Sequence, residues 1–171
     1  MKKAWLTLLL VMFAVAGSAG LFDSKQSDQQ QIQSGLEALE QMNYTGAFMH
    51  WKDLADKGNP EAQYHIGWLY ANGNGVSVDV PVAMSWWEKA ALQDHAPSAF
   101  SLGMLYMTGD GKSVKKSVPD AIKWHMKAAE NGSKDGQEMM RQLYRTRQRA
   151  VLKQFPDIAE KAWFKPEKSA K

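Results

Sequence analysis

Apolar side chains recur every three or four residues along most of this chain, a spacing that places them on one face of an α-helix. The first such run consists of Ile32, Leu36, Leu39 and Met42. A second helix is expected over 44–57. Two longer stretches, 61–94 and 97–132, each contain two helical patterns separated by a Gly-x-Gly turn. The pattern therefore predicts an all-α protein.

The two longer stretches are near copies of each other. At an offset of 36, the matched pairs are Gly67 with Gly103, Tyr70 with Tyr106, Gly73 with Gly109 and Gly75 with Gly111. Two extra residues in the second loop raise the offset to 38, which matches Ala83 with Ala121, Trp86 with Trp124 and Ala90-Ala91 with Ala128-Ala129. A repeat of this length is typical of an α-solenoid, in which each helix pair buries its apolar face against the next pair.

Incomplete copies are expected at both ends of this array. Repeat units are predicted at 31–58, 59–94 and 95–132, followed by a half unit at 133–147 and a helical cap at 148–164. In the first unit, Trp51 stands where later units have Trp87 and His125. In the half unit, Arg141 replaces the glycine of the first helix, which favours a terminal cap over another internal repeat.

Residues 1–20 have the pattern of a signal peptide for export to the periplasm of a Gram-negative-type bacterium. Lys2-Lys3 precedes an apolar run that is too short to cross a bilayer comfortably, and small residues follow it. Cleavage after Ala16, Ala19 or Gly20 and retention as an anchor all remain open. A flexible leader is expected over 21–30 and a disordered tail over 165–171.

The residues that usually carry chemistry are missing or scattered. The chain has no cysteine, which excludes thiol chemistry and cysteine-based metal sites. His50, His65, His95 and His125 have no second ligand at a repeated helical spacing, and no hydrolase or phosphate-binding motif occurs. We therefore expect no metal, no cofactor and no catalysis.

Charge divides the chain into an acidic body and a basic end. Residues 20–140 contain 10 Lys/Arg and 15 Asp/Glu, whereas residues 141–171 contain 9 Lys/Arg and 3 Asp/Glu. Two such regions can steer different partners or attract each other. The simpler interpretation is a solvated basic terminal helix.

The string A-x-x-x-[LI]-G-x-[LM]-Y-x-x-G-x-G-V, followed by A-x-x-W and A-A, resembles the Sel-one-like repeat, a relative of the tetratricopeptide repeat. The first copy matches at Ala62, Ile66, Gly67, Leu69, Tyr70, Gly73, Gly75, Val76, Ala83, Trp86, Ala90 and Ala91. The second copy departs from the string at Ser98 and Lys112. Proteins that resemble this family act as adaptors in envelope assembly, secretion, motility and effector neutralisation. One penicillin-binding branch is usually rich in cysteine, which this chain lacks.

The resemblance implies that first helices line a concave surface, so the residues that the repeat leaves free there are the candidate partner-binding residues. They are His65, Trp68, Asn72, Ser101, Met104 and Thr108, with Met139, Gln142 and Thr146 as half-unit equivalents. Trp68 can equally pack on the neighbouring unit.

The expected function is a non-enzymatic, monomeric, periplasmic module that binds a protein partner. A sharper form is an immunity protein that neutralises a secreted toxic effector. The alternatives are a cell-wall or β-lactam-binding protein and a component of a secretion or flagellar assembly. Neither nucleic-acid binding nor stable membrane insertion after cleavage is expected.

Overall fold

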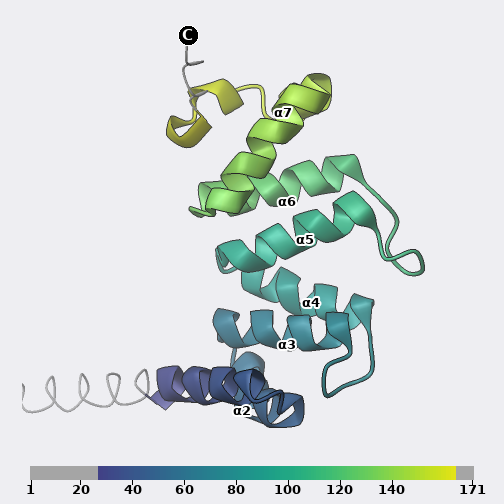
Figure 1. Ribbon diagram of the computed structural model, residues 1–171. Coiled ribbons are helices and arrows are strands. Elements are labelled where there is room, and N and C mark those ends of the chain that lie inside the picture. The colour runs from purple at the N-terminus through teal and green to yellow at the C-terminus, as the bar shows by residue number, and fades with distance from the viewer. Residues whose placement is uncertain (1–26, 165–171) are drawn as a thin grey trace, which may run out of the picture.

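The computed structural model describes residues 27–164 as a stack of helices (Figure 1). A helix over residues 27–40 comes first. It is followed by α2 (Tyr44–Asp56), α3 (Pro60–Asn72), α4 (Val80–Ala91), α5 (Ala96–Thr108), α6 (Val118–Glu130), α7 (Lys134–Gln154) and the short 3₁₀ helices η1 (Ile158–Glu160) and η2 (Ala162–Phe164). The described residues contain no strand, and the predicted all-α solenoid is confirmed.

The structure tests only part of what was predicted for the two ends of the chain. The leader expected over 21–30 is wrong for residues 27–30, which are helical and belong to a segment that is rich in the good helix former glutamine. The predicted signal peptide and the predicted disordered tail lie outside the described residues. Within 27–164, no helix combines the length and the apolar character needed to cross a bilayer.

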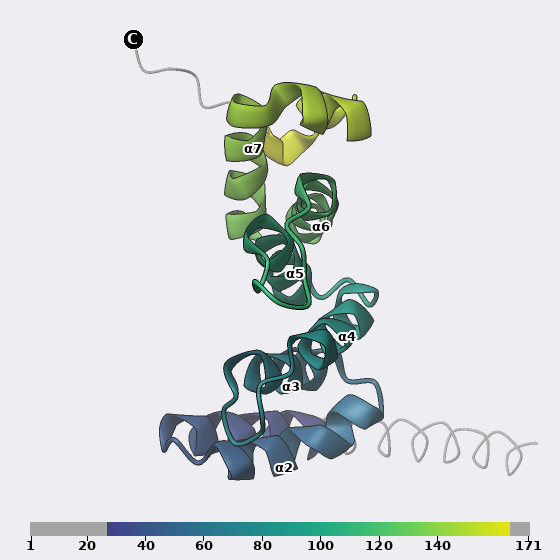
Figure 2. The same cartoon turned by 90° about the vertical axis from the view of Figure 1, so that its right-hand side faces the viewer.

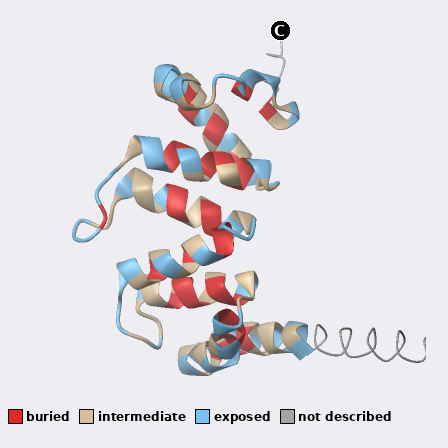
Figure 3. Cartoon of the chain, turned by 180° about the vertical axis from the view of Figure 1, so that it is seen from behind, coloured by how far each residue is buried: buried red, intermediate tan, exposed pale blue. Residues whose placement is uncertain are grey.

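Helices pack in chain order, each against the one before it and the one after it (Figures 1 and 2). Within a unit, α3 packs on α4 and α5 on α6. Between units, α4 packs on α5 and α6 on α7. Buried residues gather where neighbouring helices face one another (Figure 3). The consequence is that the core runs along the array and each unit depends on its neighbours.

Side-chain caps start most of these helices. The side-chain oxygens of Asn59 and Asp79 each accept a hydrogen bond of 3.0 Å from the backbone N–H three residues later. Asp94 ends its unit with φ 63°, the left-handed conformation that Gly58 and Gly132 take at the ends of the neighbouring units. His95, the residue before α5, makes no such cap to the backbone.

A bulky ring on each second helix lies over a glycine of the preceding first helix. A Cβ added to Gly67 would lie 2.6 Å from the Trp87 ring, and one added to Gly103 would lie 2.6 Å from His125. The Trp87 indole also donates to the Tyr64 carbonyl over 3.1 Å. Glycine is costly inside a helix, so these positions are explained by the close approach of the ring.

The C-terminal segment closes the open end of the array. Helix α7 contains a non-helical residue, Arg147 (φ −138°, ψ 39°), and the chain beyond it turns across the top of the stack (Figure 2). Ile158 and Phe164 are buried in the same cluster as Met140. The predicted half unit and cap are therefore joined by one bent helix. Arg141 donates to the Trp163 carbonyl over 2.8 Å and holds the closing segment on α7.

Candidate functional site

A cavity of about 640 Å³ lies between α5 and α7, the first helices of two consecutive units. Helix α5 contributes Met104, Met107 and Thr108, and α7 contributes Met139, Gln142, Leu143, Thr146 and Arg147. These eight residues are called the methionine groove below. Two of the six predicted partner-binding residues, Met104 and Thr108, lie in it together with all three half-unit equivalents.

The floor of the methionine groove belongs to the core of the array. Leu143 is buried, and Met107 and Met139 are partly buried against the cluster that contains Leu143. Met104 is 37% exposed at the rim. Methionine side chains are flexible and polarisable, which lets such a surface adapt to apolar side chains of different shapes.

The hydroxyl groups in the groove are already satisfied within their own helices. Thr108 Oγ1 donates to the Met104 carbonyl over 3.0 Å, and Thr146 Oγ1 donates to the Gln142 carbonyl over 2.9 Å. Each bond runs to the carbonyl four residues earlier, a common arrangement for threonine in a helix. The groove therefore offers a mainly apolar surface, and its hydroxyl groups already donate within their own helices.

One end of the methionine groove is basic. Thr146 and Arg147 line both the groove and a shallow depression formed by residues 145–150. Arg145, Arg147 and Arg149 are all exposed there. Part of the basic charge counted in the C-terminal sequence therefore lies beside the cavity.

The other four predicted residues lie elsewhere. Trp68 is partly buried and packs against the clusters on both sides of it. His65 stacks on Trp51, with ring centroids 4.3 Å apart. Ser101 is partly buried on α5, and the Asn72 amide donates to the Trp68 carbonyl over 2.8 Å. The structure therefore gathers Met104 and Thr108 in one cavity and does not bring the other four residues into it.

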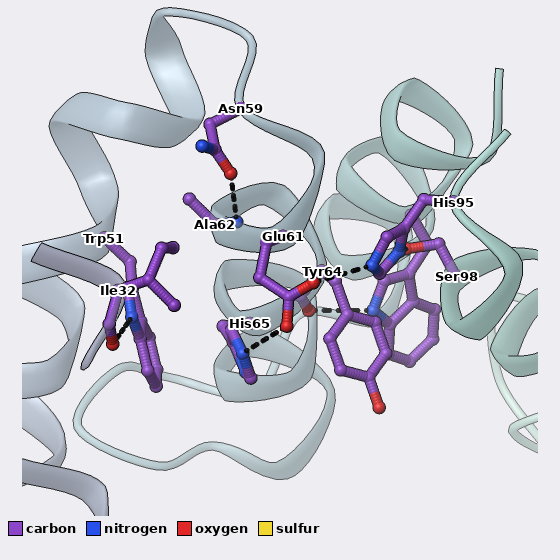
Figure 4. A network of polar contacts seen from close by, with 10 residues as sticks. Ile32, Trp51, Asn59, Glu61, Ala62, Tyr64, His65, His95 and Ser98 are labelled. Atoms are coloured by element: carbon purple, nitrogen blue, oxygen red, sulfur yellow. Dashed lines mark hydrogen bonds and ion pairs between the residues drawn. The ribbon is translucent and has the colours of Figure 1, made fainter. Parts of the chain in front are cut away.

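A polar network between α3 and α5 was not predicted (Figure 4). Glu61 Oε1 lies 3.4 Å from His65 Nε2, and its Oε2 lies 3.1 Å from His95 Nε2. His95 Nδ1 lies 2.9 Å from Ser98 Oγ. The close contact with His65 and the hydrogen bond with His95 hold the pKa of Glu61 far below its usual range. The Glu61–His65 spacing of four residues was visible in the sequence, whereas the contact with His95 depends on how the units stack.

Ser98, His95 and Glu61 contact one another in the order of a serine-hydrolase triad. The burial of Ser98 indicates a structural role instead. Ser98 is fully buried, so a substrate has no access to its hydroxyl. The network instead ties the start of one unit to the start of the next. Among residues 27–164, no group of three or more His, Cys, Asp or Glu side chains is placed to hold a metal ion.

The repeat itself matches a known family model. The model of the Sel1 repeat matches residues 60–95 and 96–133. The chain contains two Sel1 repeats. The resemblance seen in the sequence is confirmed, and the matched segments coincide closely with the α3–α4 and α5–α6 units.

Solved Sel1 repeat structures resemble a large part of the stack. A Sel1 repeat protein from Oxalobacter formigenes superposes with a TM-score of 0.60 at 34% identity, covering 66% of this chain and 44% of that one. A protective antigen with an SLR fold, present in uropathogenic Escherichia coli strains, superposes with a TM-score of 0.62 at 30% identity, covering 72% of this chain and 27% of the antigen.

Two curated relatives match over shorter regions. The DAP3-binding cell death enhancer 1 of Rattus norvegicus is 31% identical over 93 residues, which is 54% of this chain and 18% of the relative. The chitin synthase regulatory factor 3 of Schizosaccharomyces pombe is 26% identical over 98 residues, which is 57% of this chain and 10% of the relative. Sel1 repeat proteins generally mediate protein–protein interactions and are typically non-enzymatic scaffolds.

Proposed function

We propose that this chain is a non-enzymatic, exported binding module that holds a segment of a protein partner in the methionine groove. The single observation that carries the proposal is the cavity of about 640 Å³ between the first helices of two consecutive units. Its volume is within the range of about 300–1,000 Å³ that is usual for ligand sites. The signal-like pattern of residues 1–20 supports a periplasmic location.

The sharper form of the proposal is an immunity protein that binds and neutralises a secreted effector. It is supported by the roles of proteins that resemble this array, which is an argument by analogy. Deleting the gene should then make cells sensitive to wild-type siblings. Unchanged survival in such a competition would remove the immunity role and leave the binding module.

Site-specific photocrosslinking in cells tests the binding module. A photoreactive amino acid replaces Met104 in the groove, and in a control chain it replaces Met49, a methionine that is 73% exposed on α2. The expected result is a discrete crosslinked protein from position 104 and none from position 49. Crosslinks of equal yield at both positions, or none at either, would contradict the groove. Fractionating the same cells tests the periplasmic location.

A further inference from the structure

The basic end of the methionine groove indicates what kind of segment it binds. From residue 141 to the end of α7 the chain has five Lys/Arg and no Asp/Glu. Arg141 is occupied by Glu138 and by the Trp163 carbonyl. Arg145 reaches Glu138 only at 4.0 Å. The positive charge beside the cavity is therefore not fully compensated by acidic side chains.

Arg147 and Arg149 carry most of this excess. Within residues 27–164, neither has an aspartate or glutamate oxygen within 4.0 Å, the distance at which the other ion pairs of the array are formed. Arg147 lines the cavity itself, and Arg149 lines the depression that continues from it. Arginine binds carboxylates with two parallel hydrogen bonds, and an uncompensated positive patch attracts acidic partners.

The apolar part lies directly beside these charges. Met104 and Met107 on α5 and Met139 on α7 line the same cavity as Arg147. A segment that satisfies both parts must present an apolar side chain to the methionines and carboxylates to the arginines. Charge complementarity of this kind sets orientation and partner choice more than affinity.

We infer that the methionine groove binds an acidic segment of a protein partner, with an apolar side chain among the methionines and carboxylates on Arg147 and Arg149. This inference rests on the proposed function and specifies its occupant. A polyanion such as nucleic acid or an anionic membrane fits less well, because residues 20–140 have an excess of Asp/Glu that repels an extended negative surface.

Selection from a display library of random short peptides tests the inference. Peptides are selected on the full chain at low salt and sequenced. The expected result is enrichment of peptides that combine Asp/Glu with a large apolar residue. The double substitution Arg147→Glu/Arg149→Glu should weaken the binding of these peptides at least about tenfold, and added salt should weaken it too.

The matched control is Lys112→Glu/Lys115→Glu, which makes the same change of charge at two exposed residues in the loop between α5 and α6. This control should leave the binding of the selected peptides unchanged. Circular dichroism of both variants checks that the helical array is intact.

Other outcomes would overturn the inference. If the selected peptides lose binding with Met104→Gln but show no acidic bias, the groove binds protein segments and only the acidic occupant is wrong. Absence of any enriched peptide contradicts the occupant, and the crosslinking experiment then decides the proposed function separately. Cosedimentation with phosphatidylglycerol vesicles that is lost in the arginine variant would assign the patch to a membrane surface instead.

Discussion

At the scale of single residues, the third unit places a histidine where the other two units have a buried tryptophan. The Trp51 and Trp87 indoles each donate to a backbone carbonyl of the preceding helix, Ile32 and Tyr64 respectively. His125 is fully buried, and neither of its ring nitrogens has a partner in the described structure. Desolvation lowers the pKa of His125 from 6.5 to about 4. The imidazole is therefore held neutral in the folded protein.

This burial predicts acid sensitivity. The folded-state pKa lies below the unfolded one, so between pH 6.5 and about 4 the unfolded state binds the proton more readily. Stability should fall as the pH falls through this window, by up to about 3 kcal/mol. His125→Phe removes the titrating group and should flatten this part of the profile. Urea unfolding at a series of pH values measures the difference between variant and wild type.

His50, which is exposed on α2, provides the matched control. His50→Gln should leave the pH dependence of unfolding as it is in the wild type. If His125→Phe shows the same loss of stability towards pH 4 as the wild type, then protonation of His125 does not contribute to the acid sensitivity.

The alignment of Trp51, Trp87 and His125 was available from the sequence, because a fixed offset is enough to find it. The offset does not show which residues surround each ring in the folded protein. Gly35 lies under Trp51, but the first unit is too degenerate for this glycine to stand out. The repeat does not fix Trp68 either, so the sequence left both a groove position and packing on the neighbouring unit open, and the structure shows it packed between two clusters.

At the scale of helices, boundaries followed from the sequence wherever the chemistry is local. Asn59 and Asp79 cap their helices and Asp94 takes the left-handed conformation, as their residue types favour, since both roles depend on a few neighbouring atoms. The bend at Arg147 could not be predicted in this way. It is not marked by proline or glycine, and it occurs where the closing segment packs back on α7.

The contact of Glu61 with His95 joins helix α3 to helix α5, and its loss should weaken that junction. Glu61→Gln removes the charge but keeps the size of the side chain. Because Glu61 is half exposed, solvent screening limits the expected cost to about 1 kcal/mol at neutral pH. The folded pKa of Glu61 is depressed, so its contribution is present above pH 4.5 and is lost as the pH falls below it.

Thermal unfolding of Glu61→Gln at neutral and acidic pH measures this contribution. The difference from wild type should be clear near pH 7 and shrink in acid. Glu40→Gln changes an exposed glutamate that has no ion-pair partner among the described residues and should be neutral throughout. A Glu61→Gln difference that grows as the pH falls below 4.5 would contradict the assigned role of the carboxylate.

At the scale of the whole molecule, the stack was predictable but the groove was only partly so. The offset of 38 places Gln142 and Thr146 at the positions equivalent to Met104 and Thr108, because it moves a residue to the same face of the next first helix. The arginine end was visible only as a bulk charge balance. That charge lies at the end of a cavity because of the bend at Arg147 and the closing segment beyond it.

An array in which each helix packs mainly on its neighbours should respond locally to damage at one end. Ile158 is fully buried in the cluster that closes the array. Ile158→Ala leaves a cavity there and should cost about 2–4 kcal/mol, felt first by the helices that share the cluster. Hydrogen exchange should show faster exchange in α6 and α7 and unchanged exchange in α2 and α3.

The control variant Lys153→Ala, at an exposed position of α7, should leave all four helices protected. Uniformly faster exchange along the chain would instead mean that the stack unfolds as one cooperative unit, because only then does a loss at the closing segment reach α2 undiminished.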